Sequence, residues 1–443
     1  MPHQTHEIDR DSALLSRRSL LRGSAAIGVG AFLSGIPLGR MAFAAGTPGW
    51  EAVTALCSSY VDQGKVANMV AALGWGQGAA VSIDRGVLAL GEPAKADIDS
   101  LYRLYSMTKP ITGMAVMMLI DEGKLGLDQP LAEILPKFAT MKVQKVYDGG
   151  IGPDDLEPAA RPITIRNLLT HTAGLGYTII QKGPIKDAYE AAGLVPGQVT
   201  KLPMLKDMFG KFEPVGSLEA FADGLADMPL VAQPGTRWSY SVAMDLLGRV
   251  VEVASGQSFD AFLQERIFDP CGMASTWFTV PESELGRLTT NYGVLNGKLV
   301  PIDPPALSIY ADKPAFPMGG AGLVSSPRDY DRFLQMLVGY GKIDGKRVMS
   351  ELAVRVGTSN LLPEGAETKG TFIEGAGFGA AGRVSSEGSY GWGGAAGTVA
   401  FANLRLGLRA GLFTQYMPAE AYPVSSEFPV AVITDLSAMK AAA

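Results

Sequence analysis

The stretch LYSMTKPITG at residues 104–113 contains a Ser-x-x-Lys pattern, Ser106 and Lys109, and precedes the apolar run MAVMMLI. This stretch is predicted to begin as extended chain and to continue as a helix that ends near Gly123. Pro110 falls in the first helical turn, where the N–H group that proline lacks would have no partner within the helix. Residues three apart share a helix face, so the serine oxygen and lysine nitrogen can come within hydrogen-bonding reach. The N-terminal N–H groups favour negative charge on that oxygen. The pattern supplies a nucleophile and a candidate activator, and helix capping by Ser106 is the alternative.

Spacing alone does not decide between these interpretations. The same pattern recurs at Ser437 and Lys440, at the end of the chain with no helix after it, and we expect no chemistry there. Beyond residue 44 the chain has a single histidine, His171, and G-x-S-x-G occurs nowhere. A serine hydrolase built from this sequence is therefore expected to use a base other than histidine.

The first 44 residues have the features of an export signal. Arg17 and Arg18 precede a weakly apolar run, and AFA at residues 42–44 is a small-x-small cleavage site. The arginine pair favours twin-arginine export over an ordinary secretory signal, so a periplasmic or secreted protein is expected. No later run is apolar and long enough to span a bilayer.

Charge and cysteine content narrow the function classes. The leader holds five Arg and three acidic residues, so its removal changes the net charge from −6 by −2 to −8. An acidic chain without a basic run argues against a nucleic-acid partner. Cys57 and Cys271 are the only cysteines, and isolated buried thiols are favoured over a disulfide between them. No Cys/His spacing indicates zinc.

The order of predicted elements indicates an α+β fold: an antiparallel sheet flanked by helices, with a mainly helical second lobe. The sheet lobe is expected at about residues 45–148 and 311–443, and the helical lobe at about 149–310, in one hydrolase domain of residues 45–443. Helices are predicted at 50–72, 241–256, 258–268 and 325–338, a strand pair turning at 84–86 within 79–92, and antiparallel strands after about residue 371.

Two further segments follow the Ser-x-x-Lys pattern along the chain. They are RWSYSVAMDLLG at residues 237–248, which contains Tyr240, and the Gly-rich YGWGGAAGT at 390–398. This order resembles the serine β-lactamase and penicillin-binding protein superfamily, most closely the carboxylesterases similar to class C β-lactamases (family VIII esterases). NLLTHTAGL and MGGAGLVSSPRDYDRF are also similar to that group. The resemblance covers nearly all of residues 45–443 and implies a β-lactamase/DD-peptidase-like sandwich.

The resemblance assigns the catalytic roles. It makes Ser106 the acylated nucleophile and Lys109 its activating partner. Tyr240 would exchange a proton with Lys109 and deliver it to the leaving group. The backbone N–H groups of Ser106 and Ala395 would form the oxyanion hole. A core-packing role for Tyr240 is the alternative.

The resemblance also assigns the surroundings of the site. Trp392, Gly393 and Gly394 stand where β-lactamases have K-T-G, and the glycines would let this strand approach the substrate. Trp392 as a plain core aromatic is the alternative. His171 is expected to brace the site rather than to catalyse. The segment 318–322 is expected to pack behind the site.

Two departures from the β-lactamase pattern bear on the substrate. Val242 replaces the Asn that holds a β-lactam's side-chain amide, and Trp392 replaces the Lys that holds its carboxylate. The resemblance therefore implies a serine esterase acting on neutral, short-chain, small-molecule esters, without metal or cofactor, and the leader predicts that it is exported. The alternatives are a β-lactamase or D-amino-acid-specific peptidase or amidase, a non-hydrolysing acyl-binding or penicillin-binding protein, and acyl transfer between alcohols.

Overall fold

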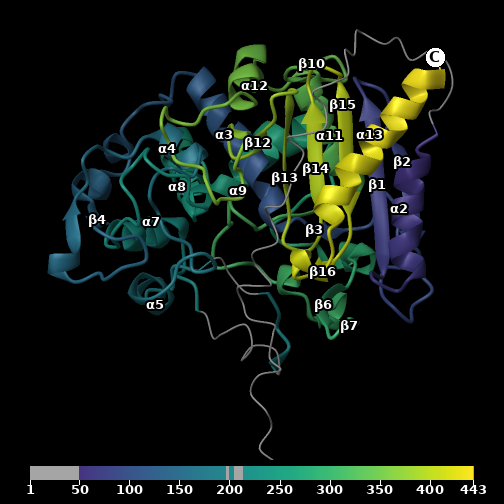
Figure 1. The fold of residues 1–443 in the computed structure, drawn as a ribbon, viewed down its shortest axis with the longest axis horizontal. Helices are drawn as coiled ribbons and strands as arrows, with labels where there is room; N and C mark the ends of the chain where they lie inside the picture. The colour runs from purple at the N-terminus through teal and green to yellow at the C-terminus, as the bar shows by residue number, and fades with distance from the viewer. Residues whose placement is uncertain (1–48, 196–198, 204–212, 443) are drawn as a thin grey trace, which may run out of the picture.

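A seven-stranded antiparallel sheet forms the centre of the fold (Figure 1). The computed structural model of the protein describes residues 49–195, 199–203 and 213–442, so the predicted leader lies outside the described residues. In spatial order the strands are β11 (Gly377–Phe378), β12 (Arg383–Val384), β13 (Ser389–Gly393), β14 (Val399–Asn403), β15 (Leu408–Phe413), β1 (Asn68–Trp75) and β2 (Val81–Gly86). Its strands thus come from both ends of the described chain.

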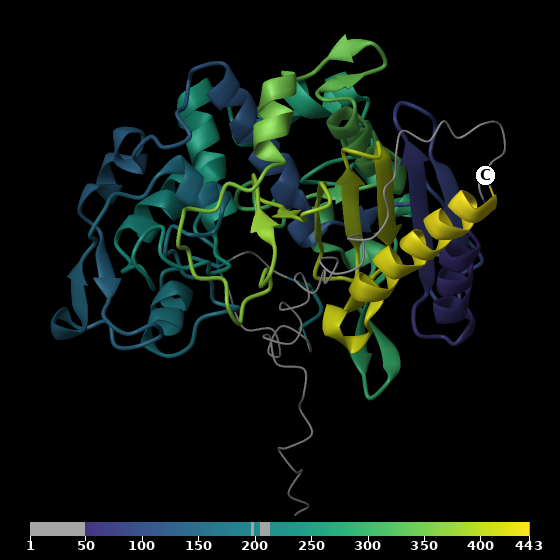
Figure 2. The ribbon, with the colours of Figure 1, turned by 45° about the horizontal axis from the view of Figure 1, so that its top comes forward.

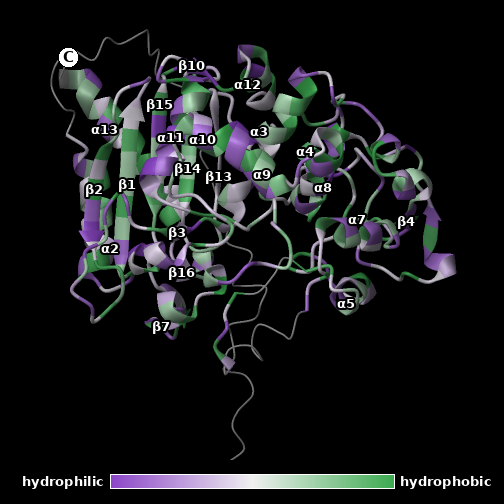
Figure 3. Cartoon of the chain, turned by 180° about the vertical axis from the view of Figure 1, so that it is seen from behind, coloured by the Kyte–Doolittle hydropathy of each residue, from purple (hydrophilic) through white to green (hydrophobic). Residues whose placement is uncertain are grey.

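Helices cover both faces of this sheet (Figures 1 and 2). On one face, α2 (Glu51–Asp62) and α13 (Val424–Ala442) share an apolar cluster with Leu408, Ala410 and Leu412. Phe413 points to the opposite face, into the larger core that includes α3 (Thr108–Asp121) and α11 (Pro327–Val338). Side chains of successive strand residues point to opposite faces of the sheet, so every second residue of a strand belongs to the same cluster. Apolar residues accordingly run along the strands in Figure 3.

Apart from α8 the remaining elements are short, and most of the helices among them lie beside the sheet (Figure 2). The helices are α4 (Ile165–Leu169), α5 (Pro184–Ala191), α7 (Leu218–Ala226), α8 (Ala243–Ser255), α9 (Phe259–Leu263), a π-helix (Gln264–Phe268), α10 (Asp269–Cys271) and α12 (Glu351–Gly357). The strands are β3 (Tyr102–Arg103) with β8 (Val324–Ser325), β4 (Lys142–Gln144) with β5 (Leu156–Pro158), β9 (Lys342–Ile343) with β10 (Lys346–Arg347), and β16 (Tyr416–Met417) with β6 (Asn291–Leu295) and β7 (Lys298–Asp303). The predicted α+β sandwich is confirmed.

The predicted helix over residues 50–72 is wrong beyond Asp62. The helix ends there, and Gly64 adopts a φ of 66°, which lets the chain turn into β1. Seven of the eight β1 residues are buried, because both faces of this strand are covered. A strand buried on both faces reads as a continuous apolar run, and such a run resembles a buried helix in sequence.

The strand pair predicted within residues 79–92 is also wrong. Asp84, Arg85 and Gly86 form the end of β2 rather than a turn, and they pair with β1. The partner of β2 therefore precedes it in the chain instead of following it.

The predicted helices over residues 241–256 and 325–338 are confirmed, as are the two buried free thiols. Gly256 ends α8 with a φ of 74°, and the Ser326 hydroxyl caps α11 by accepting a hydrogen bond from the Asp329 N–H. Both cysteines, Cys57 and Cys271, are free and buried. Within the described residues, none of the helices combines the length and apolar character that a membrane crossing requires.

Candidate active site

Ser106 lies in a single 3-10 turn, Tyr105–Met107, between β3 and α3. The preceding residue, Tyr105, has a φ of 44°, in a region that non-glycine residues rarely adopt. The surroundings must hold this conformation, because such backbone strain persists only where neighbouring contacts determine it. One such contact is the hydrogen bond of 3.2 Å that the Asn291 side-chain amide donates to the Tyr105 hydroxyl.

Two side chains converge on the Ser106 oxygen. Lys109 Nζ donates to Ser106 Oγ over 3.1 Å, and the Tyr240 hydroxyl donates to the same oxygen over 2.8 Å. All three side chains are buried, with Ser106 the most exposed at 5%. Lys109 Nζ also lies 4.7 Å from the centre of the Tyr240 ring. The fold thus brings together the three residues that the sequence assigned to catalysis.

Trp392, in β13, extends this network. Its indole N–H donates to the Tyr240 oxygen over 3.2 Å, and its ring centre lies 5.8 Å from that of Tyr240. The chain after β13 passes close to the residues before Ser106: a Cβ on Gly394 would collide with the Leu104 carbonyl. Gly393 ends β13, and Ala395 lies in the turn that follows, where it packs in one apolar cluster with Tyr105, the neighbour of Ser106. The oxyanion hole formed by the N–H groups of Ser106 and Ala395 stays a prediction.

Val242, the other predicted substrate-binding residue, is fully buried at the start of α8. Its N–H donates to the Gly176 carbonyl. It is absent from the lining of the pocket that is described below.

Sequence reasoning missed Asp245 and the role of Gly320. The second hydrogen bond of Lys109 Nζ, at 2.6 Å, goes to the Gly320 carbonyl, and the Gly320 N–H donates to Asp245 Oδ1 over 3.0 Å. The 318–322 segment therefore contacts Lys109 directly. Burial raises the pKa of Asp245, and the positive charge of Lys109 acts in the opposite direction. An acidic residue on the buried face of α8 was the available signal in the sequence.

His171 packs against the catalytic tyrosine. Its ring centre lies 4.8 Å from that of Tyr240, and its Nδ1 lies 3.0 Å from Ser241 Oγ. The Ser241 N–H also donates to Nδ1, so this nitrogen is an acceptor. Burial, together with the charge of Lys109, lowers the pKa of His171 well below its usual range. A neutral ring that packs on Tyr240 suits a bracing role.

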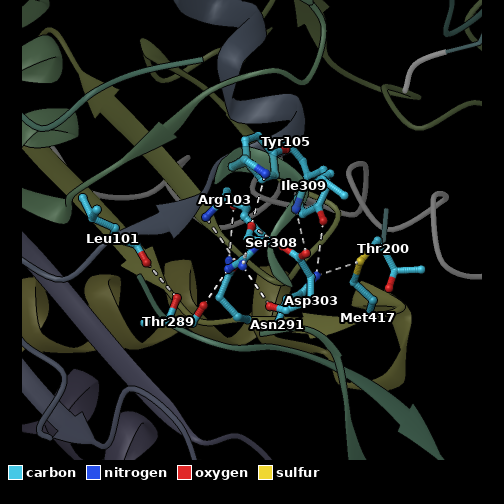
Figure 4. Close-up of polar contacts among 12 residues, drawn as sticks. Leu101, Arg103, Tyr105, Thr200, Thr289, Asn291, Asp303, Ser308, Ile309 and Met417 are labelled. Carbon is cyan, nitrogen blue, oxygen red and sulfur yellow. Dashed lines mark hydrogen bonds and ion pairs between the residues drawn. The ribbon is translucent and has the colours of Figure 1, made fainter. Parts of the chain in front are cut away.

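A buried ion pair supports the strand that leads to the nucleophile (Figure 4). Arg103, in β3, and Asp303 are both fully buried and are joined by a contact of 2.5 Å. Arg103 also donates to the carbonyl oxygens of Thr289 and Asp303, and Ser308 donates to the carboxylate. With these hydrogen bonds the buried charges are satisfied, as burial of an ion pair requires. The network links β3 to β7 directly beneath the Tyr105 turn.

A pocket of about 430 Å³ is lined in part by residues that neighbour the catalytic ones in the chain. Tyr105, which directly precedes Ser106, forms part of its wall, as do Met318, Ala321 and Gly322 from the segment that binds Lys109. The other lining residues are Lys201, Glu213, Pro214, Phe278, Ile309, Tyr310, Asp312, Lys313, Pro314 and Ala315. We call this cavity the Phe278 pocket.

Comparison with known proteins identifies the family. The beta-lactamase family model matches residues 53–427. The chain belongs to the beta-lactamase family. This confirms the predicted resemblance, because the matched region contains the three segments on which it rested.

The proteins that are similar in sequence to this chain include an esterase. Esterase EstB of Burkholderia gladioli is 31% identical over 347 residues, which is 73% of this chain and 79% of EstB. Protein Rv1367c of Mycobacterium tuberculosis is 37% identical over 270 residues, 60% of this chain. That match spans 61% of the length of the mycobacterial protein.

Solved structures have the same fold. EstCE1, described as a hydrolase with promiscuous acyltransferase activity, superposes with a TM-score of 0.67 at 24% identity, over 86% of this chain and 97% of EstCE1. Unliganded simvastatin synthase from Aspergillus terreus gives a TM-score of 0.65 at 21% identity, over 87% and 98% of the two chains.

Proposed function

We propose that the protein is an exported serine esterase that hydrolyses neutral esters through an acyl-enzyme on Ser106. The observation that carries this proposal is the pair of hydrogen bonds that Lys109 and Tyr240 make to one buried serine oxygen. A nucleophile whose oxygen contacts two proton-exchanging groups can lose its proton without a histidine. The name of EstB, esterase, and the leader at residues 1–44 support the activity and the export respectively.

The geometry suggests the following steps. Ser106 Oγ attacks the ester carbonyl carbon, and its proton passes to the Lys109–Tyr240 pair. The carbonyl oxygen becomes an oxyanion held by the N–H groups of Ser106 and Ala395. Tyr240 then protonates the leaving alcohol as its bond to the carbonyl carbon breaks. A water molecule attacks the acyl-enzyme in the same way, which releases the acid and returns the proton to Ser106.

The substrate class follows from the residues beside the relay. Trp392 offers a ring and one N–H, already donated to Tyr240, where a lysine would pair with a substrate carboxylate. Val242 offers no side-chain amide. An anionic acylamino substrate would leave its buried amide unpaired, at about 1–3 kcal/mol, and would lose a charge-assisted contact as well. Neutral esters with short acyl chains have neither an amide that would be left unpaired nor a carboxylate that needs a positive partner.

The test compares nucleophile variants on two substrate types. Purified protein lacking residues 1–44 is expected to hydrolyse p-nitrophenyl acetate and to turn over a chromogenic cephalosporin slowly or not at all. Ser106→Ala should abolish esterase activity, whereas His171→Asn should retain a substantial part of it in folded protein. Full activity of Ser106→Ala would refute the proposal, and cephalosporin turnover as fast as ester turnover would favour a β-lactamase.

Acyl transfer is a second candidate, favoured by the names of further relatives. Monacolin J acid methylbutanoyltransferase of Aspergillus terreus is 30% identical over 247 residues, 54% of this chain and 53% of that protein. The same acyl-enzyme would serve both reactions, because an alcohol can replace water in the second step. Adding an alcohol to the ester assay and measuring the new ester against the free acid separates the two.

A further inference from the structure

The Phe278 pocket is built from anchored aromatic side chains. The Tyr310 hydroxyl donates to the Ala321 carbonyl over 3.2 Å, and the Tyr310 ring meets that of Tyr105 edge to face, with centres 6.4 Å apart. Phe278 packs against Phe259, with ring centres 5.9 Å apart. A wall held by such contacts keeps its shape without a ligand, as small-molecule pockets usually do.

The charged residues at the pocket cancel one another. Lys201 and Lys313 are opposed by Glu213 and Asp312, and Lys201 forms an ion pair of 2.5 Å with Asp312. The lining side chains therefore carry no net charge. A charged ligand group would gain little from this rim, whereas an apolar group would gain contact with the three aromatic rings.

The volume is large for a short acyl chain. At about 30 Å³ per water molecule, 430 Å³ corresponds to ~14 waters. An acetyl group fills a small part of that space and leaves most of the aromatic surface in contact with water. A volume of this size lies in the range of ~300–1,000 Å³ that holds drug-sized molecules.

We propose that the Phe278 pocket binds one bulky, uncharged, apolar half of the ester, of aromatic or fused-ring size. This inference rests on the proposed esterase function and adds the substrate class. The pocket adjoins the catalytic residues along the chain, because its wall includes Tyr105, the neighbour of Ser106, and Ala321, the neighbour of Gly320, whose carbonyl binds Lys109. Because each buried methylene favours binding by about fourfold, a ring system in the pocket favours its ester by well over tenfold.

The test fills the pocket and compares esters of different size. Vinyl acetate is small on both sides, vinyl 2-naphthoate has a bulky acyl half, and 2-naphthyl acetate has a bulky alcohol half. Ala315→Trp places a large side chain at an exposed position that lines the pocket, and Ala306→Trp makes the same change at an exposed position outside it. The rate of ester hydrolysis is measured from the protons that the reaction releases, and kcat/KM is determined for each substrate.

Ala315→Trp should lower kcat/KM for one naphthyl ester at least tenfold more than for vinyl acetate, and Ala306→Trp should change neither. The ester that loses activity identifies the half that occupies the pocket. Ile309→Trp narrows the pocket from another wall and serves where Ala315→Trp does not fold. Equal effects on all three esters in a folded pocket variant would overturn the inference. Loss of the Ser106 requirement for vinyl acetate hydrolysis would instead overturn the esterase proposal.

Discussion

Replacing Trp392 by phenylalanine tests whether the Tyr240 oxygen carries negative charge during the reaction. Trp392→Phe keeps an aromatic ring against Tyr240 but removes the N–H that donates to its oxygen over 3.2 Å. In the resting enzyme this bond joins neutral groups. When Tyr240 has given up its proton, the same bond reaches a negatively charged oxygen and becomes stronger.

The expected loss is the difference between the two states of this bond. A neutral hydrogen bond contributes about 0.5–1.5 kcal/mol and a bond to a charged group about 1.5–3 kcal/mol. Only the strengthening of this hydrogen bond between the resting state and the transition state affects kcat. Trp392→Phe should therefore raise the activation free energy by about 1–1.5 kcal/mol. At 1.36 kcal/mol per tenfold, kcat of Trp392→Phe should fall by about five- to thirteenfold.

Trp238 provides a matched control within the same site. Its ring stacks on Tyr240 with centres 5.9 Å apart, and it is buried like Trp392. Its indole nitrogen has no hydrogen-bond partner among the described residues. Trp238→Phe therefore removes similar packing without removing a hydrogen bond to Tyr240.

The assay is kcat on p-nitrophenyl acetate, with urea unfolding to show that both variants lose similar stability. Trp238→Phe should retain kcat within about twofold of the native enzyme, an expectation that follows from its lack of a bond to the relay. Equal kcat in the two variants would refute the reasoning, since packing alone would then account for the effect of Trp392.

Three further predictions concern the relay, the buried ion pair and the histidine. Lys109→Ala and Tyr240→Phe should each lower kcat by about a hundredfold or more, with little added loss in the double variant; multiplying losses would mean separate proton paths. Asp303→Asn leaves the Arg103 charge buried without its partner, so the free energy of unfolding in urea should fall by about 3–5 kcal/mol, and a loss below 1 kcal/mol would contradict this. The pKa of His171 is lowered on folding, so protonation favours the unfolded chain. Between pH 6.5 and 5.5 the native protein should lose about 1 kcal/mol of stability that His171→Gln does not lose, and parallel curves of stability against pH would count against it.

Local patterns in the sequence predicted the parts of the site that lie within one element. Ser106 and Lys109 are one helical turn apart, so their contact of 3.1 Å follows from helix geometry alone. The contact of Tyr240 with Ser106 spans 134 residues and could be expected only through the family resemblance. No local pattern contains that information, because it depends on how α3 and α8 pack.

The contacts that the sequence did not predict come from backbone groups and from segments far apart. The Gly320 carbonyl binds Lys109 across 211 residues, and carbonyl groups leave no trace in residue identity. The glycine itself was a signal: a Cβ at this position would lie 2.8 Å from an Asp245 oxygen. The β1 error has a different origin, since burial of both faces removes the alternation that distinguishes strands from helices.

The lysine of this site is oriented by a chain of contacts that does not involve the substrate. Asp245 Oδ1 accepts from the Gly320 N–H, and the Gly320 carbonyl accepts from Lys109 Nζ, so α8 fixes the amine through a backbone segment. The same helix begins just after Tyr240, whose hydroxyl is the second partner of Ser106. One helix thus positions both proton-exchanging groups, and a shift of α8 would move them together relative to the nucleophile. A relay without histidine depends on this coupling, because in the proposed steps the proton of Ser106 passes to the Lys109–Tyr240 pair before Tyr240 delivers it to the leaving alcohol.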